Sequence, residues 1–148
     1  MANTLYNIGR QLFLEAQINW KSDTIMCALV DTSPGTGYTF SPAHGYWSVI
    51  AGLGTGAYPG VPKRLVRLVG GPDLDTTDGA ADADDVTFVA VPSSANAIEA
   101  IIIFKDTGVA GTSPLIAYID TATGLPITPN GGDIIVTWDN GVNKIFRL

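Results

Sequence analysis

The sequence predicts a mainly β protein, an antiparallel β-sandwich or barrel of about seven strands with one N-terminal helix. Short segments rich in Ile, Val and aromatic residues recur from residue 25 onward, separated by turns of Gly, Pro, Asn and Asp. Helical spacing of apolar residues is confined to residues 4–17. The length of 148 residues is typical of one domain, so we expect residues 1–148 to form a single β-rich domain.

The expected helix covers residues 4–17, and Thr4 is placed to cap its first turn. Apolar residues then recur on one helical face: Leu5, Ile8, Leu12 and Ala16. Gly9 lowers the helix propensity by about 1 kcal/mol relative to Ala. We expect the apolar face to pack against the rest of the domain or against a neighbouring subunit, which makes its first three members interface candidates.

Seven segments have the length and residue types of strands. They are residues 25–31, 64–69, 86–91, 97–105, 115–119, 134–139 and 142–148. The segment 97–105 is the strongest, because apolar residues occupy both of its faces, which is typical of a strand near the centre of a sheet. We expect residues 115–119 to pair with it.

The last two of these segments predict a hairpin. Ile134, Val136 and Trp138 alternate with the residues between them, as in a strand with one buried face. Asn140-Gly141 follows, and these residues tolerate the positive φ angles of a type I′ turn. Residues 142–148 would then return as the partner strand.

The connection between residues 33 and 62 is long, rich in Gly and Pro, and aromatic. So long a connection in a compact domain is usually functional or folded over a surface. Its aromatic residues supply further interface candidates: Tyr38, Phe40, Tyr46 and Trp47. The segment 47–50 is compatible with a short helical turn or with a strand.

The composition indicates a surface that is covered by other molecules. Charged residues make up 15% of the chain, against about 25% in typical soluble domains. The alternative to a covered surface is a thermally stable monomer that is rich in Ala and Gly. A net charge of −6 argues against binding to nucleic acid, because phosphate backbones repel acidic domains. No signal peptide pattern or apolar run of about 18 residues is present, so we expect neither secretion nor a membrane partner.

The residues of common catalytic and cofactor sites are scarce. Cys27 lies in an apolar run and is expected to be a small buried hydrophobe, while His44 lies in a Pro/Gly/aromatic loop without a catalytic motif. The glycine-rich segment 52–56 lacks the Lys-Ser/Thr ending of a phosphate loop. The two glutamates, Glu15 and Glu99, are far apart. We therefore expect no enzyme activity and no cofactor.

An acidic segment is the strongest candidate for a metal site. Its aspartates are Asp73, Asp75, Asp78, Asp82, Asp84 and Asp85. The first three begin like a calcium loop, but no Glu closes the loop, so the calcium prediction is weak. The alternatives are a solvated acidic loop, or a set of turn caps and ion pairs in which the last three aspartates contact Arg64 and Arg67.

Several motifs of the chain resemble small virion structural proteins of tailed bacteriophages and prophages. The motifs are Leu5-Tyr6-x-x-Gly9-Arg10-x-x-Phe13-Leu14, Ile18-Asn19-Trp20, Ala81-Asp82-Ala83-Asp84-Asp85-Val86-Thr87-Phe88, Leu115-Ile116-Ala117-Tyr118-Ile119, Gly124-Leu125-Pro126-Ile127 and Trp138-Asp139-Asn140-Gly141. The resemblance covers both ends and the middle of the chain, while residues 33–62 match less well. It implies a location in the virion, and it carries over no catalytic or metal-binding residues.

Three functions are compatible with this resemblance and composition. The first is a capsid decoration (cement) protein that binds the outside of the major capsid protein shell, with copies of the chain associating as a homo-oligomer. The second is a tail, neck or fibre-base component. The third is a host-surface or glycan-binding module that uses the aromatic loop. For the first, we expect synthesis in the bacterial cytoplasm and a final location on the capsid surface.

Overall fold

The computed structural model describes residues 3–66, 74–75 and 79–148, and it confirms a mainly β, antiparallel fold. The strands in the described residues are β1 (Thr4–Leu5), β2 (Ile25–Val30), β3 (Lys63–Arg64), β4 (Leu74–Asp75), β5 (Ala80–Ala81), β6 (Val86–Phe88), β7 (Ala100–Lys105), β8 (Leu115–Ile119), β9 (Ile134–Val136) and β10 (Phe146–Arg147). The helices are α1 (Asn7–Leu14) and α2 (Ser48–Ala51), with short 3-10 turns η1 (Thr55–Ala57) and η2 (Ala110–Thr112).

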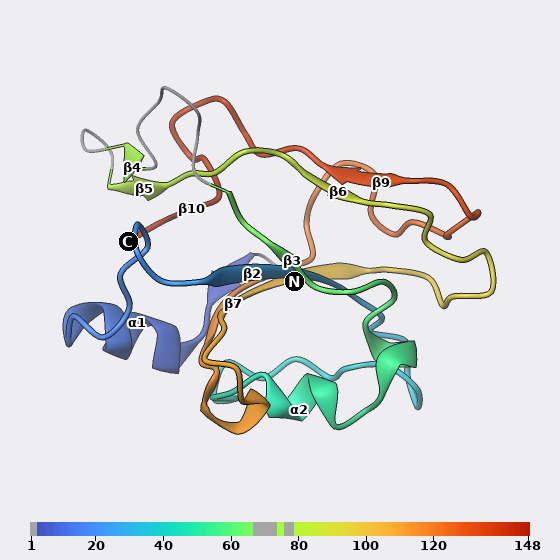
Figure 1. Cartoon of the computed structure of the whole chain (residues 1–148), viewed down its shortest axis with the longest axis horizontal. Helices are drawn as coiled ribbons and strands as arrows, with labels where there is room; N and C mark the ends of the chain where they lie inside the picture. Colours follow the sequence, from blue (N-terminus) through green and yellow to red (C-terminus); the bar gives the residue numbers. More distant parts are fainter. Residues whose placement is uncertain (1–2, 67–73, 76–78) are drawn as a thin grey trace.

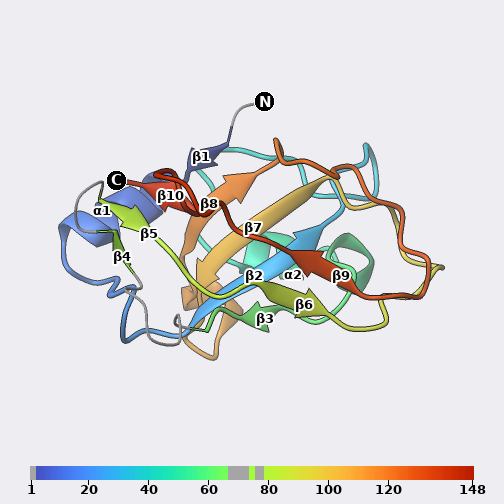
Figure 2. The same ribbon diagram turned by 90° about the horizontal axis from the view of Figure 1, so that it is seen from above.

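A five-stranded antiparallel sheet forms the centre of the molecule, in the order β1-β8-β7-β2-β3 (Figure 2). Strand β7 pairs with β2 along its full length, from Ala100 opposite Val30 to Lys105 opposite Ile25. On its other side β7 pairs with β8. The predictions that residues 97–105 supply a central strand and that residues 115–119 pair with it are both confirmed.

Two smaller sheets cover one face of the central sheet. They are β10-β5-β4 and the two-stranded ribbon β6-β9, and Figure 1 shows them as a layer above β2, β3 and β7. The other face is covered by α2 and the connections around it, which lie below the sheet in the same view. The arrangement is therefore sandwich-like, with strands in one covering layer and the long connection in the other.

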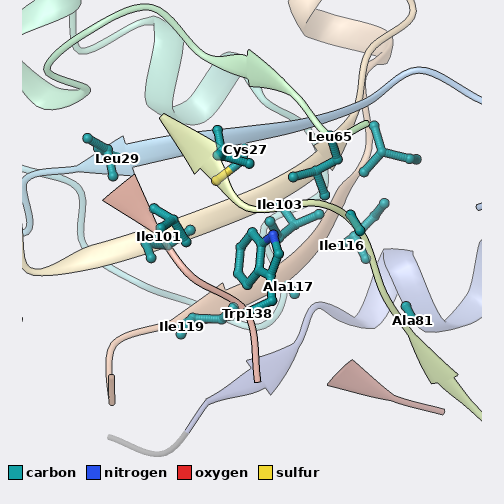
Figure 3. Close-up of a cluster of buried hydrophobic side chains, with 14 of the residues drawn as sticks. Cys27, Leu29, Leu65, Ala81, Ile101, Ile103, Ile116, Ala117, Ile119 and Trp138 are labelled. Atoms are coloured by element: carbon teal, nitrogen blue, oxygen red, sulfur yellow. The ribbon is translucent and has the colours of Figure 1, made fainter. Parts of the chain in front are cut away.

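The central sheet separates two hydrophobic cores. The ribbon-side core lies between the central sheet and the smaller sheets, and Figure 3 shows its central members, which include Cys27, Ile103 and Trp138. The α2-side core lies against the opposite face and includes Tyr6, Ile50 and Phe104. Alternate residues of a strand point to opposite faces, so each central strand contributes to both cores.

The long connection 33–62 folds over the α2-side face, as its length and composition predict. Ile50 is fully buried there, and the indole ring of Trp47 stacks on the ring of Phe104 at a centroid distance of 4.3 Å and an interplanar angle of 5°. The segment 47–50, for which helix and strand were both open, contributes to α2. The connection therefore supplies the apolar cover that this face of the sheet requires.

The N-terminal helix is shorter than the predicted range 4–17. Thr4 and Leu5 pair with Tyr118 and Ala117 in the central sheet, so Thr4 caps no helix. At the other end Ala16 has a left-handed φ of 59°. The N–H of Ala16 donates to the carbonyl of Phe13, and the N–H of Gln17 donates to that of Leu12, which closes α1 in a Schellman motif.

Gly9 lies where α1 touches the central sheet. A Cβ at this position would stand 2.9 Å from the Cα of Ile116, so only glycine allows this approach without displacement. The register of β7 and β8 shifts at this level and leaves Ile116 outside the regular ladder. The carbonyl of Ile116 accepts instead from the N–H of Tyr6, just before the helix.

The predicted C-terminal hairpin is wrong. Strand β9 pairs with β6, and β10 pairs with β5, so residues 134–139 and 142–148 are not partners. The φ angle of Gly141 is not positive, as a type I′ turn would require, and its N–H donates to the carboxylate of Asp139. The buried faces explain the pairing, because Ile134 and Val136 lie directly opposite Phe88 and Val86. This match of apolar residues outweighs the turn signal.

The predicted strand 64–69 is only partly described. Strand β3 comprises Lys63 and Arg64, and Leu65 is buried in the ribbon-side core. Residues 67–69 lie outside the described residues. The predicted strand 86–91 is shortened to three residues, Val86–Phe88.

Helix α1 offers a stability test that opposes ordinary helix propensity. Gly9→Ala is expected to destabilise the fold by about 1–3 kcal/mol, because the added methyl meets the backbone of Ile116. Ala16→Gly is expected to stabilise it by about 0.5–1 kcal/mol, because glycine adopts a left-handed conformation freely. Urea unfolding at neutral pH measures both changes. A stabilising Gly9→Ala substitution would contradict the close packing of α1.

Candidate functional site

An open groove lies between the N-terminal elements and the last strand of the chain. We call it the α1–β10 groove. Its polar part has a volume of about 540 Å³ and is lined by β1, by β8 and by residues 139–147. Its apolar part has a volume of about 480 Å³ and lies beside α1, lined by Phe13, Leu14 and Leu148. The two parts share Leu5, Arg10 and Arg147, so they form one continuous surface.

The groove combines exposed apolar and basic side chains. Leu14 is 89% exposed and Leu148 is 70% exposed, which is unusual for leucines that lie side by side along one hollow. The basic residues are Arg10, Lys144 and Arg147, while Asp139 is the one acidic residue among those that line the groove. Lys144 forms an ion pair with Asp82 at 3.3 Å. Three of the eight basic residues of the chain thus gather here.

A second exposed apolar surface lies on the turns around α2. The backbone is helical from Trp47 to Gly52, and Tyr46 and Leu53 flank these turns. Tyr46, Val49 and Leu53 are spaced three and four residues apart, which places them on one face of the turns. All three are exposed, and we call them the α2 stripe. The inward face carries Trp47 and Ile50, which are buried in the α2-side core. The stripe therefore stands on a rigid base.

The predicted interface residues fall into three groups. Tyr46 is exposed and belongs to the α2 stripe. Leu5, Ile8, Leu12 and Phe40 are half-buried. Tyr38 and Trp47 are buried in the α2-side core, so their rings pack within the chain and present no docking surface, which corrects the prediction for these two. Sequence reasoning missed Arg10, Lys144 and Arg147, because residues so far apart in the chain give no shared local signal.

A hydrogen-bonded chain joins Tyr6, Tyr38 and His44. The Tyr38 hydroxyl lies 3.0 Å from the Tyr6 hydroxyl and 2.8 Å from His44 Nδ1, and it accepts from the N–H of Ser41. All donors and acceptors are satisfied if Tyr6 donates to Tyr38 and Tyr38 donates to His44 Nδ1. This assignment leaves the His44 proton on Nε2. The imidazole ring of His44 thus accepts a hydrogen bond from Tyr38, and this bond holds the loop that carries His44.

Two carboxylates hold the turn that follows β2. Asp31 is fully buried and accepts from the N–H of Ser33 at 2.7 Å and from the Asn96 amide at 2.9 Å. Glu99 accepts from the N–H of Thr32 at 2.7 Å. Burial by itself raises the pKa of Asp31, but the hydrogen bonds from Ser33 and Asn96 outweigh it and hold the pKa below its usual value.

The predicted calcium residues are not brought together in the described structure. Asp73 and Asp78 lie outside the described residues, and of Asp75 the backbone alone is described, in β4. Within the described ranges no group of three or more His, Cys, Asp or Glu side chains is arranged to hold a metal ion. A calcium site at these three aspartates stays a prediction.

The later aspartates of the acidic segment have structural partners. The backbone carbonyls of Asp82 and Asp84 accept from the indole N–H groups of Trp20 and Trp138. The carboxylate of Asp85 accepts from the backbone N–H of Trp138. Asp82 pairs with Lys144. These contacts hold residues 82–85 against Trp20 on one side and Trp138 on the other, both in the ribbon-side core. Arg67 lies outside the described residues, so its predicted ion pair stays a prediction.

Cys27 is fully buried in the ribbon-side core, as predicted, and burial raises the pKa of its thiol. The glycine-rich segment 52–56 follows α2 directly, is exposed, and ends within η1. None of the helices in the described residues is long and apolar enough to cross a bilayer.

Comparisons of the chain with models of known protein families and with curated protein sequences find no match.

Asp31→Asn is expected to destabilise the fold by about 1–3 kcal/mol at neutral pH, because one acceptor oxygen becomes a donor that faces donors. The folded-state pKa of Asp31 is lowered, so the stability that its carboxylate contributes is present above the unfolded pKa of about 3.9. It is lost as the pH falls through the folded pKa. The stability difference between wild type and variant should therefore shrink below about pH 4.

Urea unfolding at several pH values measures this difference, and Glu15→Gln, at an exposed carboxylate, is the control. A difference that stays constant from neutral to acidic pH would contradict the assignment.

The raised pKa of Tyr118 predicts that the fold loses stability at alkaline pH. Burial, followed by the nearby charge of Asp120, raises the pKa of Tyr118 to about 12. Burial also raises the pKa values of Tyr6 and Tyr38. A raised folded-state pKa means that the stability is complete below the unfolded pKa of about 10 and is lost as the pH rises through the folded value.

Tyr118→Phe removes one of these groups, so the variant should lose less stability than wild type between about pH 9 and pH 11. Thermal unfolding followed by circular dichroism at both pH values makes the comparison. Equal losses in the two proteins would show that Tyr118 does not carry the effect.

Proposed function

We propose that the chain is a structural protein of a tailed-phage virion that decorates the capsid, binding the outside of the major capsid protein shell and stabilising it. The observation that carries the proposal is the α2 stripe, an exposed apolar face in a chain with 15% charged residues. Exposed apolar faces of this kind mark protein interfaces. The resemblance of the chain motifs to phage virion proteins supports the same proposal.

The α2 stripe suits binding to a large preformed surface. Its side chains stand on turns that are fixed from below by the stacked rings of Trp47 and Phe104. A rigid aromatic and aliphatic surface loses little conformational entropy on binding. Tyr46 adds a large ring and a hydroxyl group, a residue type enriched at interfaces. We therefore assign the stripe to the shell-facing side.

A binding assay with capsids that lack the chain tests the proposal. Purified wild-type protein should bind saturably to capsids of the phage that encodes it. Val49→Asp and Leu53→Asp should each weaken binding by about tenfold or more, because each places a charge in an apolar contact. Val61→Asp is the matched control, since Val61 is exposed on a loop outside the stripe.

Absence of wild-type binding at every ionic strength would contradict decoration of the capsid. Binding to purified tails or necks in place of capsids would favour the alternative of a tail, neck or fibre-base component.

A further inference from the structure

We propose that copies of this chain associate head to tail, with the α1–β10 groove of one copy receiving the outer face of the β6–β9 ribbon of the next. The outer face, which we call the ribbon face, consists of Asp85, Thr87, Val89, Asp133 and Ile135. The proposal concerns contacts between copies and stands apart from the α2 stripe and its assigned role.

The ribbon face is an unusual surface for a solvated strand pair. Val86, Phe88, Ile134 and Val136 point into the ribbon-side core, so the residues between them point outward. Among these outward residues, Val89 is 66% exposed and Ile135 is 63% exposed. Thr87 lies directly opposite Ile135 in the register. The face therefore combines two exposed apolar side chains with a threonine and with an exposed aspartate directly before each strand.

The charges of the two surfaces are complementary. Copies with a net charge of −6 repel one another, so opposite charges at the contact favour self-association. The groove presents the exposed Arg10 and Arg147 beside exposed leucines, with Asp139 as its acidic residue, while Lys144 is paired with Asp82 within the chain. The ribbon face carries two aspartates, and residues 85–89 and 133–137 contain no basic residue. Each surface thus offers apolar area and the charge that the other lacks.

The same charges disfavour symmetric pairing. A groove placed against a second groove would bring Arg10 and Arg147 against their own copies, and two ribbon faces would bring Asp85 and Asp133 together. Figures 1 and 2 both place α1 and β10 at one end of the molecule, with β6 and β9 toward the other. One copy therefore cannot fill its own groove, and the contact is heterologous, of the kind that builds rings or filaments.

Sedimentation velocity of the purified chain over a range of concentrations tests the proposal without any capsid, so its result does not depend on whether the protein binds a shell. Wild type should self-associate. Arg10→Glu reverses a groove charge, and Ile135→Lys adds a positive charge to the ribbon face. For each variant alone, the association constant should be lower than that of wild type by about tenfold or more. Lys21→Glu and Val61→Lys make the same charge changes at exposed positions outside both surfaces, and they should associate as wild type.

Mixing the two variants is the decisive step. The intact groove of Ile135→Lys can accept the intact ribbon face of Arg10→Glu, while the altered groove and altered ribbon face now carry opposite charges. The mixture should therefore recover association that neither variant shows alone.

Three outcomes would overturn the proposal. One is a wild-type chain that stays monomeric at all concentrations. Another is association that Ile135→Lys leaves unchanged, which is expected of groove-to-groove pairing. The third is a mixture that associates no better than its components.

Discussion

The burial of β7 on both faces is the constraint on which the rest of the molecule depends. Residues Ala100–Phe104 are all buried, with Ile101 and Ile103 in one core and Ile102 and Phe104 in the other. A strand of this kind needs a hydrogen-bonded neighbour on each edge and an apolar layer on each face. Strands β2 and β8 supply the edges. The β6–β9 ribbon and the long connection 33–62 supply the layers, by different means.

The two covering layers explain why exposed apolar surface occurs on opposite sides of the molecule. Short helical turns and a two-stranded ribbon are thin elements, and side chains on their outer faces meet no further layer of the chain. Packing within the chain therefore does not restrict which residue types occupy the outward positions of the ribbon and of the α2 turns. In this chain they include large apolar side chains, among them Leu53 and Ile135. The thinness of the two layers thus couples the fold to the position of the exposed apolar surface.

Local sequence patterns could predict the class of fold and its centre. The doubly apolar run around Ile101–Phe104 indicates a central strand, and the aromatic connection after Asp31 indicates a surface cover. The pairing of the last strands could not be predicted from local patterns. Asn140-Gly141 permits a tight turn, but the partner of Ile134 and Val136 is decided by Val86 and Phe88, about fifty residues away.

The helix and the groove show the same limit. Ala16 continues the helical spacing of apolar residues, yet hydrogen bonds to Leu12 and Phe13 turn the chain there. The groove depends on Arg10 and Arg147 meeting across the fold, and such proximity has no signature in the neighbourhood of either residue. What sequence reasoning found is short-range periodicity, and what it missed is long-range pairing.

The pairing of β1 with β8 has a consequence for biosynthesis. Thr4 and Leu5 leave the ribosome early, but their partners Tyr118 and Ala117 follow only after most of the chain has been translated. The first strand must therefore wait as an unpaired segment, and the loop that it finally closes is one of the longest in the fold. Because the groove is lined by residues of both 3–14 and 139–148, it cannot form until residue 148 has left the ribosome. Neighbouring chains on one messenger therefore lack the groove until translation has passed residue 148.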